Sequence, residues 1–340
     1  MGRKTGYIVA ILLLAVGALV ALLARKQTRP YLVLTGQVFG TYYNIRYQSS
    51  QDLETAIAAR LEAVNHSLSM FNPQSVISRI NRNEDMTADS LVAEVFTVAL
   101  RVYRLSGGAF DITVAPLVNR WGFGTSARDS MAVSQCEIDS LLRLVGMDKV
   151  SLTNGSIVKT DRRICLDASA IAKGYACDRV ARLLDSCGCI NYIVDIGGEV
   201  VAKGVNDKGG KWRIGITKPT DGAGMNEQEL QEVIETNDMA MATSGNYRRF
   251  YYAGGEKRSH TIDPRTGRPV QHNLLSATVV APTCMLADAL ATACMVLGEE
   301  EALSLIDRCG NAACYLIVAR GDTMATVLSD NWETMAKMQK

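Results

Sequence analysis

Three things are scarce in this chain of 340 residues, and each absence excludes a class of protein. The formal net charge is only +1, with 36 basic and 35 acidic residues dispersed along the chain, so the basic surface expected of a nucleic-acid-binding protein is missing. The nine cysteines include no C-x-x-C pair, so neither a zinc site nor a redox dithiol is indicated, and no disulfide can be assigned. There is also no internal repeat or low-complexity tract, and the length suits one large catalytic domain.

An apolar stretch lies near the N-terminus, where Tyr7 to Ala24 contains no charged residue and is flanked by basic residues. About eighteen apolar residues suit a membrane-spanning helix or a signal peptide. Because Leu22 to Arg25 is a poor cleavage site, we expect an uncleaved anchor over residues 1–29. The catalytic domain, residues 30–335, is then expected on the extracytoplasmic, periplasmic side of the inner membrane.

Hydrophobic periodicity and turn residues predict a chain that mixes helices and strands, with more strands than long helices in its second half. The polar stretch Asp221 to Glu235 is typical of a surface excursion. The predicted helices cover 53–68, 91–105, a segment starting near 170, 284–297 and 299–308; the predicted strands cover 32–34, 38–47, 192–196, 199–203, 212–217, 248–252, 275–280 and 314–319, with the first two joined around Thr35-Gly36-Gln37.

Two oxygen-bearing side chains, Asp288 and Thr292, are four residues apart in the predicted helix 284–297 and therefore lie on one face of it. One carboxylate beside one hydroxyl suits a hard cation that completes its coordination with water, backbone carbonyl and substrate phosphate, and magnesium is the natural candidate. The alternative is an alanine-rich core helix whose Asp and Thr only meet its solvated edge.

Four further segments combine small residues with polar groups. They are Gly107 to Gly124, Leu166 to Tyr175, Thr243 to Arg249 and Ser259 to Arg268. Each has a structural alternative: a packed turn for the first, a solvated lysine in the second, and a simple hairpin connection for the third.

The second and fourth of these segments carry the most specific chemistry. Asp167 and Ser169 are predicted to cap a helix that starts near Ala170 and has Lys173 in its first turn. A lysine there opposes the helix dipole, which favours an anionic ligand. In the fourth segment His260 precedes a forced turn, and of the three histidines it is the preferred titrating group, although a structural hydrogen bond would also explain it.

Taken in order, these motifs resemble the FAD:protein FMN transferase family, the ApbE-type flavin transferases, from about Phe39 to Val318. The resemblance implies a single α+β (mixed α/β) catalytic domain, T-fold-related, with a largely antiparallel sheet flanked by helices and FAD in a cleft formed by loops. The motifs that carry it are Phe39-Gly-Thr41, Leu68 to Ser75 with Ile77-Ser78 and Ile80-Asn81, Gly107 to Asp111, Trp121 to Gly124, Asp167 to Tyr175, Gly197-Gly198, Thr243 to Tyr247, Ser259 to Pro269 and Ala287 to Thr292.

The same resemblance assigns binding roles. Asp288, Thr292 and the backbone carbonyl of Ala170 match the magnesium ligands of the family. We add Ser244 and Gly245, from the third segment, as candidate FAD contacts. Matching positions that touch the FAD are Phe39, Phe71, Ala109, Phe110, Asp111, Asp167, Lys173 and Ile262. Phe39 and Phe71 stand where many members carry Met and Tyr, which keeps an apolar surface but loses a hydroxyl at Phe71.

The implied reaction moves FMN from FAD to a threonine or serine hydroxyl of an acceptor protein and releases AMP. His260 is the expected base, with Asp263 either orienting the site or acting as the base itself. Expected acceptors are subunits of sodium-pumping quinone reductase or Rnf-type complexes and exported flavin-binding domains. Many members are lipoproteins, but the first cysteine here is Cys136, so the apolar segment would have to serve as the anchor. Two alternatives stay open: a magnesium-dependent FAD pyrophosphatase that yields FMN and AMP, and a non-catalytic FAD-binding protein.

Overall fold

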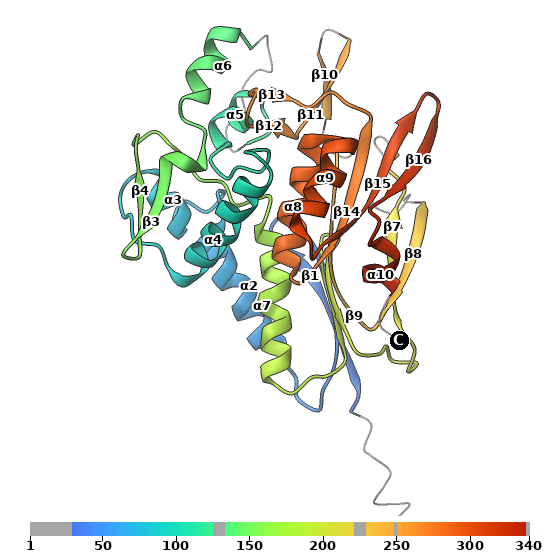
Figure 1. Ribbon diagram of the computed structural model, residues 1–340. Helices are drawn as coiled ribbons and strands as arrows, with labels where there is room; N and C mark the ends of the chain where they lie inside the picture. Colours follow the sequence, from blue (N-terminus) through green and yellow to red (C-terminus); the bar gives the residue numbers. More distant parts are fainter. Residues whose placement is uncertain (1–28, 125–132, 221–228, 248–249, 254, 338–340) are drawn as a thin grey trace, which may run out of the picture.

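The domain is built on one eight-stranded antiparallel sheet with the strand order β1-β2-β5-β6-β9-β14-β15-β16 (Figure 1). The computed structural model describes residues 29–124, 133–220, 229–247, 250–253 and 255–337. The strands of the sheet are β1 (Tyr31–Val38), β2 (Thr41–Gln48), β5 (Tyr192–Ile196), β6 (Glu199–Lys203), β9 (Asp238–Gly245), β14 (Leu274–Ala281), β15 (Ala313–Arg320) and β16 (Thr323–Leu328).

Helices cover one face of this sheet and enclose the main core, which buries apolar side chains from both layers. Within the helical layer, α7 and α8 pack against each other and against the central strands. The helices of this face are α2 (Glu54–Leu68), α3 (Val76–Asn81), α4 (Ser90–Leu105), α7 (Ala172–Ser186), α8 (Cys284–Leu297) and α9 (Glu299–Cys309).

A second, smaller core lies on the other face of the sheet. There the hairpin of β7 (Trp212–Thr217) and β8 (Leu230–Thr236), together with α10 (Trp332–Lys337), covers apolar residues that include Val200 and Met241. Because side chains alternate along a strand, Val200 faces this second core while its neighbour Glu199 faces the helices. The sheet is therefore the middle of three layers, and the polar residues on its helical side are enclosed by α7 and α8.

A third cluster of apolar residues forms a small lobe beside the sheet, in which Trp121 donates a hydrogen bond from Nε1 to the carbonyl of Gly267 at 2.8 Å. Gly267 has a φ of +70°, and a Cβ atom there would lie 2.6 Å from Ile138, so the turn closes tightly on the lobe. The elements around this lobe are α5 (Ala115–Arg120), α6 (Gln135–Leu142), β10 (Phe250–Ala253), β11 (Glu256–Ser259), β12 (Ile262–Asp263) and β13 (Arg268–Pro269). The hairpin of β3 (Val150–Thr153) and β4 (Ser156–Lys159) and the short 3-10 helix at Met147–Lys149 contribute apolar residues to the main core instead.

The expected fold class, a single α+β domain with a largely antiparallel sheet and flanking helices, is confirmed. The predicted helices and most predicted strands are present within a few residues of their expected ends. One turn was misplaced: Thr35-Gly36-Gln37 lies inside β1, and the connection is Phe39-Gly40, with φ values of +52° and +72°. Positive φ at both central positions is typical of a type I′ hairpin turn, and the long pairing of β1 with β2 determines where the turn falls.

The described end of the stretch Asp221 to Glu235 belongs mostly to β8, whose first three residues are exposed and which pairs with β7. A further local expectation was wrong. Asp167 and Ser169 do not cap α7, which begins at Ala172 after Ile171. Asp167 instead accepts a hydrogen bond from the Ser169 backbone N–H at 2.8 Å, closing an Asx turn just before the helix.

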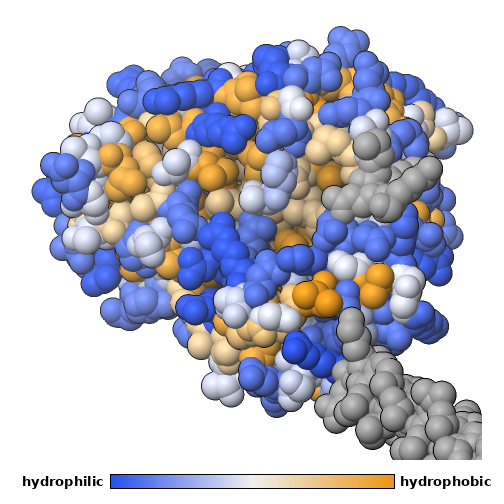
Figure 2. Space-filling view, turned by 60° about the horizontal axis from the view of Figure 1, so that its bottom comes forward, coloured by the Kyte–Doolittle hydropathy of each residue, from blue (hydrophilic) through white to orange (hydrophobic). Residues whose placement is uncertain are grey.

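The expected anchor, Tyr7 to Ala24, lies outside the described residues. Among the helices that the structure describes, none is long and apolar enough to cross a membrane. On the face seen in Figure 2, apolar and hydrophilic side chains are interspersed, and the two kinds are not segregated to opposite halves.

Candidate active site

The candidate cation ligands lie where the N-terminal turn of α7 meets the middle of α8. Asp288 is buried, and its Oδ2 accepts a hydrogen bond from the backbone N–H of Gly174 at 3.0 Å. Thr292 lies one turn further along α8, and its Oγ1 is 3.3 Å from Oγ of Ser244 at the end of β9. The structure thus brings Ser244, a strand hydroxyl predicted from a separate segment, to the predicted pair of Asp288 and Thr292 on α8.

Gly174 permits this arrangement because it has no side chain. A Cβ atom at this position would lie 2.3 Å from the carbonyl oxygen of Cys284 and 2.8 Å from Cβ of Asp288. The two helices therefore approach as closely as their backbones allow, and the carboxylate of Asp288 reaches the unsatisfied N–H groups of the first turn of α7.

Lys173 projects from the same turn and forms a very short ion pair with Glu199, which follows the Gly197-Gly198 turn between β5 and β6. Burial by itself lowers the pKa of Lys173, but the charges of Glu199 and Asp288 outweigh it and hold the pKa above its usual value. Lys173 is therefore a charged, positioned ammonium group. Sequence reasoning missed Glu199, although a carboxylate in a strand directly after a glycine pair, opposite a helical lysine, was a usable signal.

Hydrogen bonds connect the other predicted motifs to one another. The backbone N–H of Asp167 donates to the carbonyl of Ile112 at 2.6 Å, which joins the first and second segments. Asn81 exchanges two hydrogen bonds of 2.8 Å with the backbone of Leu166. In the fourth segment, Thr261 donates from Oγ1 to Oδ1 of Asn246 at 2.5 Å, two residues beyond Ser244. Motifs far apart in the sequence thus form one continuous assembly.

Asp111 is held in a tight local arrangement in the first segment. Its Oδ1 accepts hydrogen bonds from the backbone N–H and the Oγ1 of Thr113, at 2.7 and 2.6 Å. Burial nevertheless dominates and raises the pKa of Asp111 to about 6. A carboxyl group of this kind can carry or release a proton near neutral pH, or donate to an anionic ligand when it is protonated.

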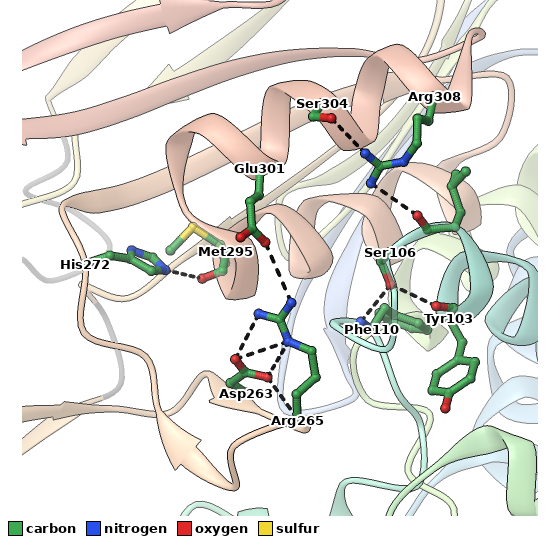
Figure 3. Close-up of polar contacts among 11 residues, drawn as sticks. Tyr103, Ser106, Phe110, Asp263, Arg265, His272, Met295, Glu301, Ser304 and Arg308 are labelled. Atoms are coloured by element: carbon green, nitrogen blue, oxygen red, sulfur yellow. Dashed lines mark hydrogen bonds and ion pairs between the residues drawn. The ribbon is translucent and has the colours of Figure 1, made fainter.

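The loop that carries His260 lies between β11 and β12, and the imidazole packs edge-on to Phe123 with ring centroids 6.3 Å apart. Asp263, which follows in β12, is engaged elsewhere. Its carboxylate accepts hydrogen bonds from the backbone and guanidinium of Arg265 at 2.8 to 3.3 Å, and Arg265 also pairs with Glu301 of α9 at 3.7 Å (Figure 3). The contacts of Asp263 are those of a residue that holds the turn.

The other two histidines have different surroundings. Burial lowers the pKa of His272, whose Nε2 lies 3.0 Å from the carbonyl of Met295 (Figure 3). His66 is exposed in the last turn of α2, away from the predicted motifs in the sequence. His260 is thus the histidine that lies within a candidate catalytic segment.

The predicted apolar FAD contacts have unequal access to a ligand. The Phe71 ring is 71% exposed and so is available for contact. Phe39 adopts a φ of +52°, a conformation that a non-glycine residue keeps only when the surrounding structure imposes it, often at a functional site. Phe110, Ala109 and Ile262 are buried, so the rings and methyl groups of these residues mainly support the segments that carry them.

The residues present fit a single hard cation. Within the described ranges, Asp288 accepts a hydrogen bond on Oδ2 from Gly174, and Thr292, whose hydroxyl contacts Ser244, lies one turn further along α8. No group of three or more His, Cys, Asp or Glu residues suited to a metal occurs among the residues described. The side chains that the sequence predicted as ligands are instead one carboxylate and one hydroxyl, oxygen donors that suit magnesium better than zinc.

The fold is that of a flavin transferase. The chain is similar to the flavin transferase ApbE from Vibrio cholerae, with a TM-score of 0.81 and 36% identity over 90% of this chain and 99% of that chain. It is equally similar to the flavinyl transferase ApbE of Pseudomonas stutzeri, solved in the apo form, with a TM-score of 0.81 and 30% identity over 92% of this chain and 99% of the other. The protein is therefore an enzyme of this class.

Residues 39–316 match the ApbE family, and the chain belongs to this family of flavin transferases. Among curated relatives, the FAD:protein FMN transferase of Vibrio cholerae is 37% identical and covers 91% of this chain and 94% of its own length. The FAD:protein FMN transferase of Escherichia coli K12 is 35% identical over 93% of this chain and 92% of its own. The family expected from the sequence motifs is confirmed.

Proposed function

We propose that this protein transfers the FMN moiety of FAD to a serine or threonine hydroxyl of an acceptor protein, in a magnesium-dependent reaction that releases AMP. The observation that carries the proposal is the junction of α7 and α8. There Asp288 and Thr292 offer oxygen ligands beside a helix N-terminus and beside Lys173. A cation site next to a helix N-terminus and an ammonium group suits a substrate diphosphate.

In this proposal, Asp288, Thr292 and the carbonyl of Ala170 hold the magnesium ion. When bound, the cation supplies positive charge that neutralises the diphosphate and the departing AMP phosphate. Lys173, in the first turn of α7, binds the phosphate oxygens, while Phe39 and Phe71 provide apolar surface for the ring systems of FAD. The remaining contacts with FAD come from Asp111, Asp167, Ser244 and Gly245.

The chemical step forms one bond and breaks another. The acceptor hydroxyl oxygen attacks the FMN phosphorus, and the bond from that phosphorus to the bridging oxygen breaks, so that AMP leaves with the bridging oxygen. A ring nitrogen of His260 takes the hydroxyl proton, since an imidazole is suited to exchange protons near neutral pH. Asp263, already paired with Arg265, holds the His260 loop and is not the base.

We further propose that the acceptors are flavin-carrying subunits of membrane redox complexes, such as sodium-pumping quinone reductase or Rnf-type complexes, or exported flavin-binding domains. The catalytic domain would then face the periplasm and be tied to the inner membrane by the apolar segment Tyr7 to Ala24, whose length suits a membrane span.

Intact-mass spectrometry tests the reaction directly. The full chain in detergent is incubated with FAD, Mg²⁺ and a flavin-carrier domain from the same genome, and the carrier is weighed. A mass gain equal to FMN less one water, the change for a phosphoester, that disappears with EDTA supports both the transfer and the metal. Production of free FMN and AMP with an unmodified carrier would instead favour a pyrophosphatase, and FAD binding without AMP would favour a non-catalytic protein. The names of the curated relatives favour transfer.

A further inference from the structure

Glu199 is a buried carboxylate that the proposed reaction does not use. Its side chain is only 3% exposed. Oε1 forms the short ion pair with Lys173, and Oε2 is a buried oxygen with no hydrogen-bond partner in the structure. Burying a charge is costly unless it is paired and fully hydrogen-bonded, and an unpartnered buried oxygen is rare in folded proteins. The position of Glu199 therefore requires a reason beyond stability.

The reason lies in a competition for the ammonium group of Lys173. Two carboxylates, Glu199 and Asp288, act on this one lysine. If Lys173 paired with Asp288, its positive charge would occupy the carboxylate that the cation needs. Instead Lys173 pairs with Glu199, while Asp288 uses one oxygen to accept from Gly174 and keeps the other.

We infer that Glu199 is a positioning residue that holds Lys173 away from Asp288 and so keeps the Asp288 carboxylate available to the divalent cation. The hairpin turn Gly197-Gly198 makes this possible. Both glycines adopt positive φ, and Gly198 donates its N–H to Asp195 at 3.0 Å, so Glu199 enters β6 directly opposite the first turn of α7. The inference rests on the proposed metal site.

The inference is tested by measuring how tightly the full chain binds Mn²⁺ in the absence of FAD and acceptor. The electron paramagnetic resonance signal of free Mn²⁺ is followed as the protein is titrated. The Glu199→Gln variant keeps the side-chain shape but removes the charge, and a carboxylate outcompetes an amide for an ammonium. Lys173 then turns to Asp288, and Mn²⁺ affinity falls about tenfold, as is typical when a residue that orients a metal ligand is lost. Adding Lys173→Met to this variant removes the competitor, so affinity returns to within about threefold of the wild type.

The double variant, Glu199→Gln with Lys173→Met, distinguishes a positioning role of Glu199 from a direct effect of its charge on the cation. If it binds Mn²⁺ as weakly as Glu199→Gln alone, Glu199 acts through its own charge and the inference is wrong. Wild-type affinity in Glu199→Gln would also overturn it. Thermal unfolding checks that both proteins are folded, and the double variant replaces a buried ion pair by neutral groups, a change that folded proteins tolerate. Failure of the proposed transfer would look different, because the wild type would then bind Mn²⁺ yet never modify a carrier.

Discussion

Asp178 and Asp288 cap each other's helices across the contact between α7 and α8. Asp178 of α7 accepts hydrogen bonds from the backbone N–H groups of Cys284 and Met285 at the start of α8, both at 2.9 Å. Asp288 of α8 accepts one from Gly174 at the start of α7. Each carboxylate therefore accepts from backbone N–H groups in the first turn of the other helix, and the two carboxylates hold the helix crossing on which the candidate cation site is built.

These two carboxylates should respond differently to mutation. Asp178→Ala leaves two buried N–H groups of α8 without their acceptor, so we expect the free energy of unfolding to fall by about 1–3 kcal/mol while FMN transfer persists. Asp288→Asn keeps an oxygen that can accept from Gly174, so the fold should persist while transfer falls by at least about a hundredfold through loss of the charged ligand.

Urea unfolding and intact-mass assays of both variants check this pair, each variant serving as the control for the other. Loss of transfer with wild-type stability in Asp178→Ala would contradict the assignment, as would normal transfer in Asp288→Asn.

Because α7 and α8 approach each other closely at Gly174, adding a single methyl group at this position should strongly destabilise the fold. In Gly174→Ala the new Cβ would meet the Cys284 carbonyl at 2.3 Å, so the helices must separate. We expect destabilisation by about 2–4 kcal/mol, within the range for severe core mutations, measured by thermal unfolding. Gly210→Ala is the matched control, because its Cβ would meet nothing closer than 3.6 Å and its φ is not positive. Equal melting temperatures for the two variants would rule out the steric account.

Asp111 predicts a pH dependence of stability. Its pKa is raised from 3.8 to about 6 in the folded protein, so the folded state binds the proton more tightly than the unfolded chain. The stability that this group contributes is therefore present at low pH and is lost as the pH rises from about 4 to about 6.

In Asp111→Asn the oxygen that accepts from Thr113 remains but the titration is gone. We expect the free energy of unfolding of the wild type, minus that of the variant, to drop by about 2–3 kcal/mol between pH 4 and pH 7. Urea titrations at four pH values measure this difference. A flat or rising difference would show that Asp111 is not buried as a raised-pKa carboxyl group.

His260 and Asp263 are distinguished by their contacts. If His260 takes the proton, His260→Ala should lower the rate of FMN transfer by about 10²–10⁴ while FAD binding is largely kept. Asp263→Asn retains an acceptor for Arg265, so its rate of FMN transfer should fall by less than about tenfold. The neutral acceptor holds the turn more weakly but remains in place. Single-turnover transfer and FAD fluorescence titration give the rate and the affinity separately. The reverse order of losses would make Asp263 the base.

The sequence alone determined the class and the order of the elements. Helical spacing of apolar residues identified α2, α4, α8 and α9, because burial on one face imposes a local period. Asp288 and Thr292 were paired correctly on α8 for the same reason, since four residues make about one turn. Motifs in a specific order then identified the family without any three-dimensional information.

Only the tertiary structure decided which polar groups meet. The start of α7 at Ala172, its cap from Asp288 and the pairing of Lys173 with Glu199 all depend on residues from 26 to 114 positions away in the chain. That Asp263 is paired with Arg265 was likewise invisible in the sequence. Local sequence encodes periodicity and turns, whereas the partner of a buried charge is chosen by packing, because every enclosed polar group must find its partner in whatever element lies opposite.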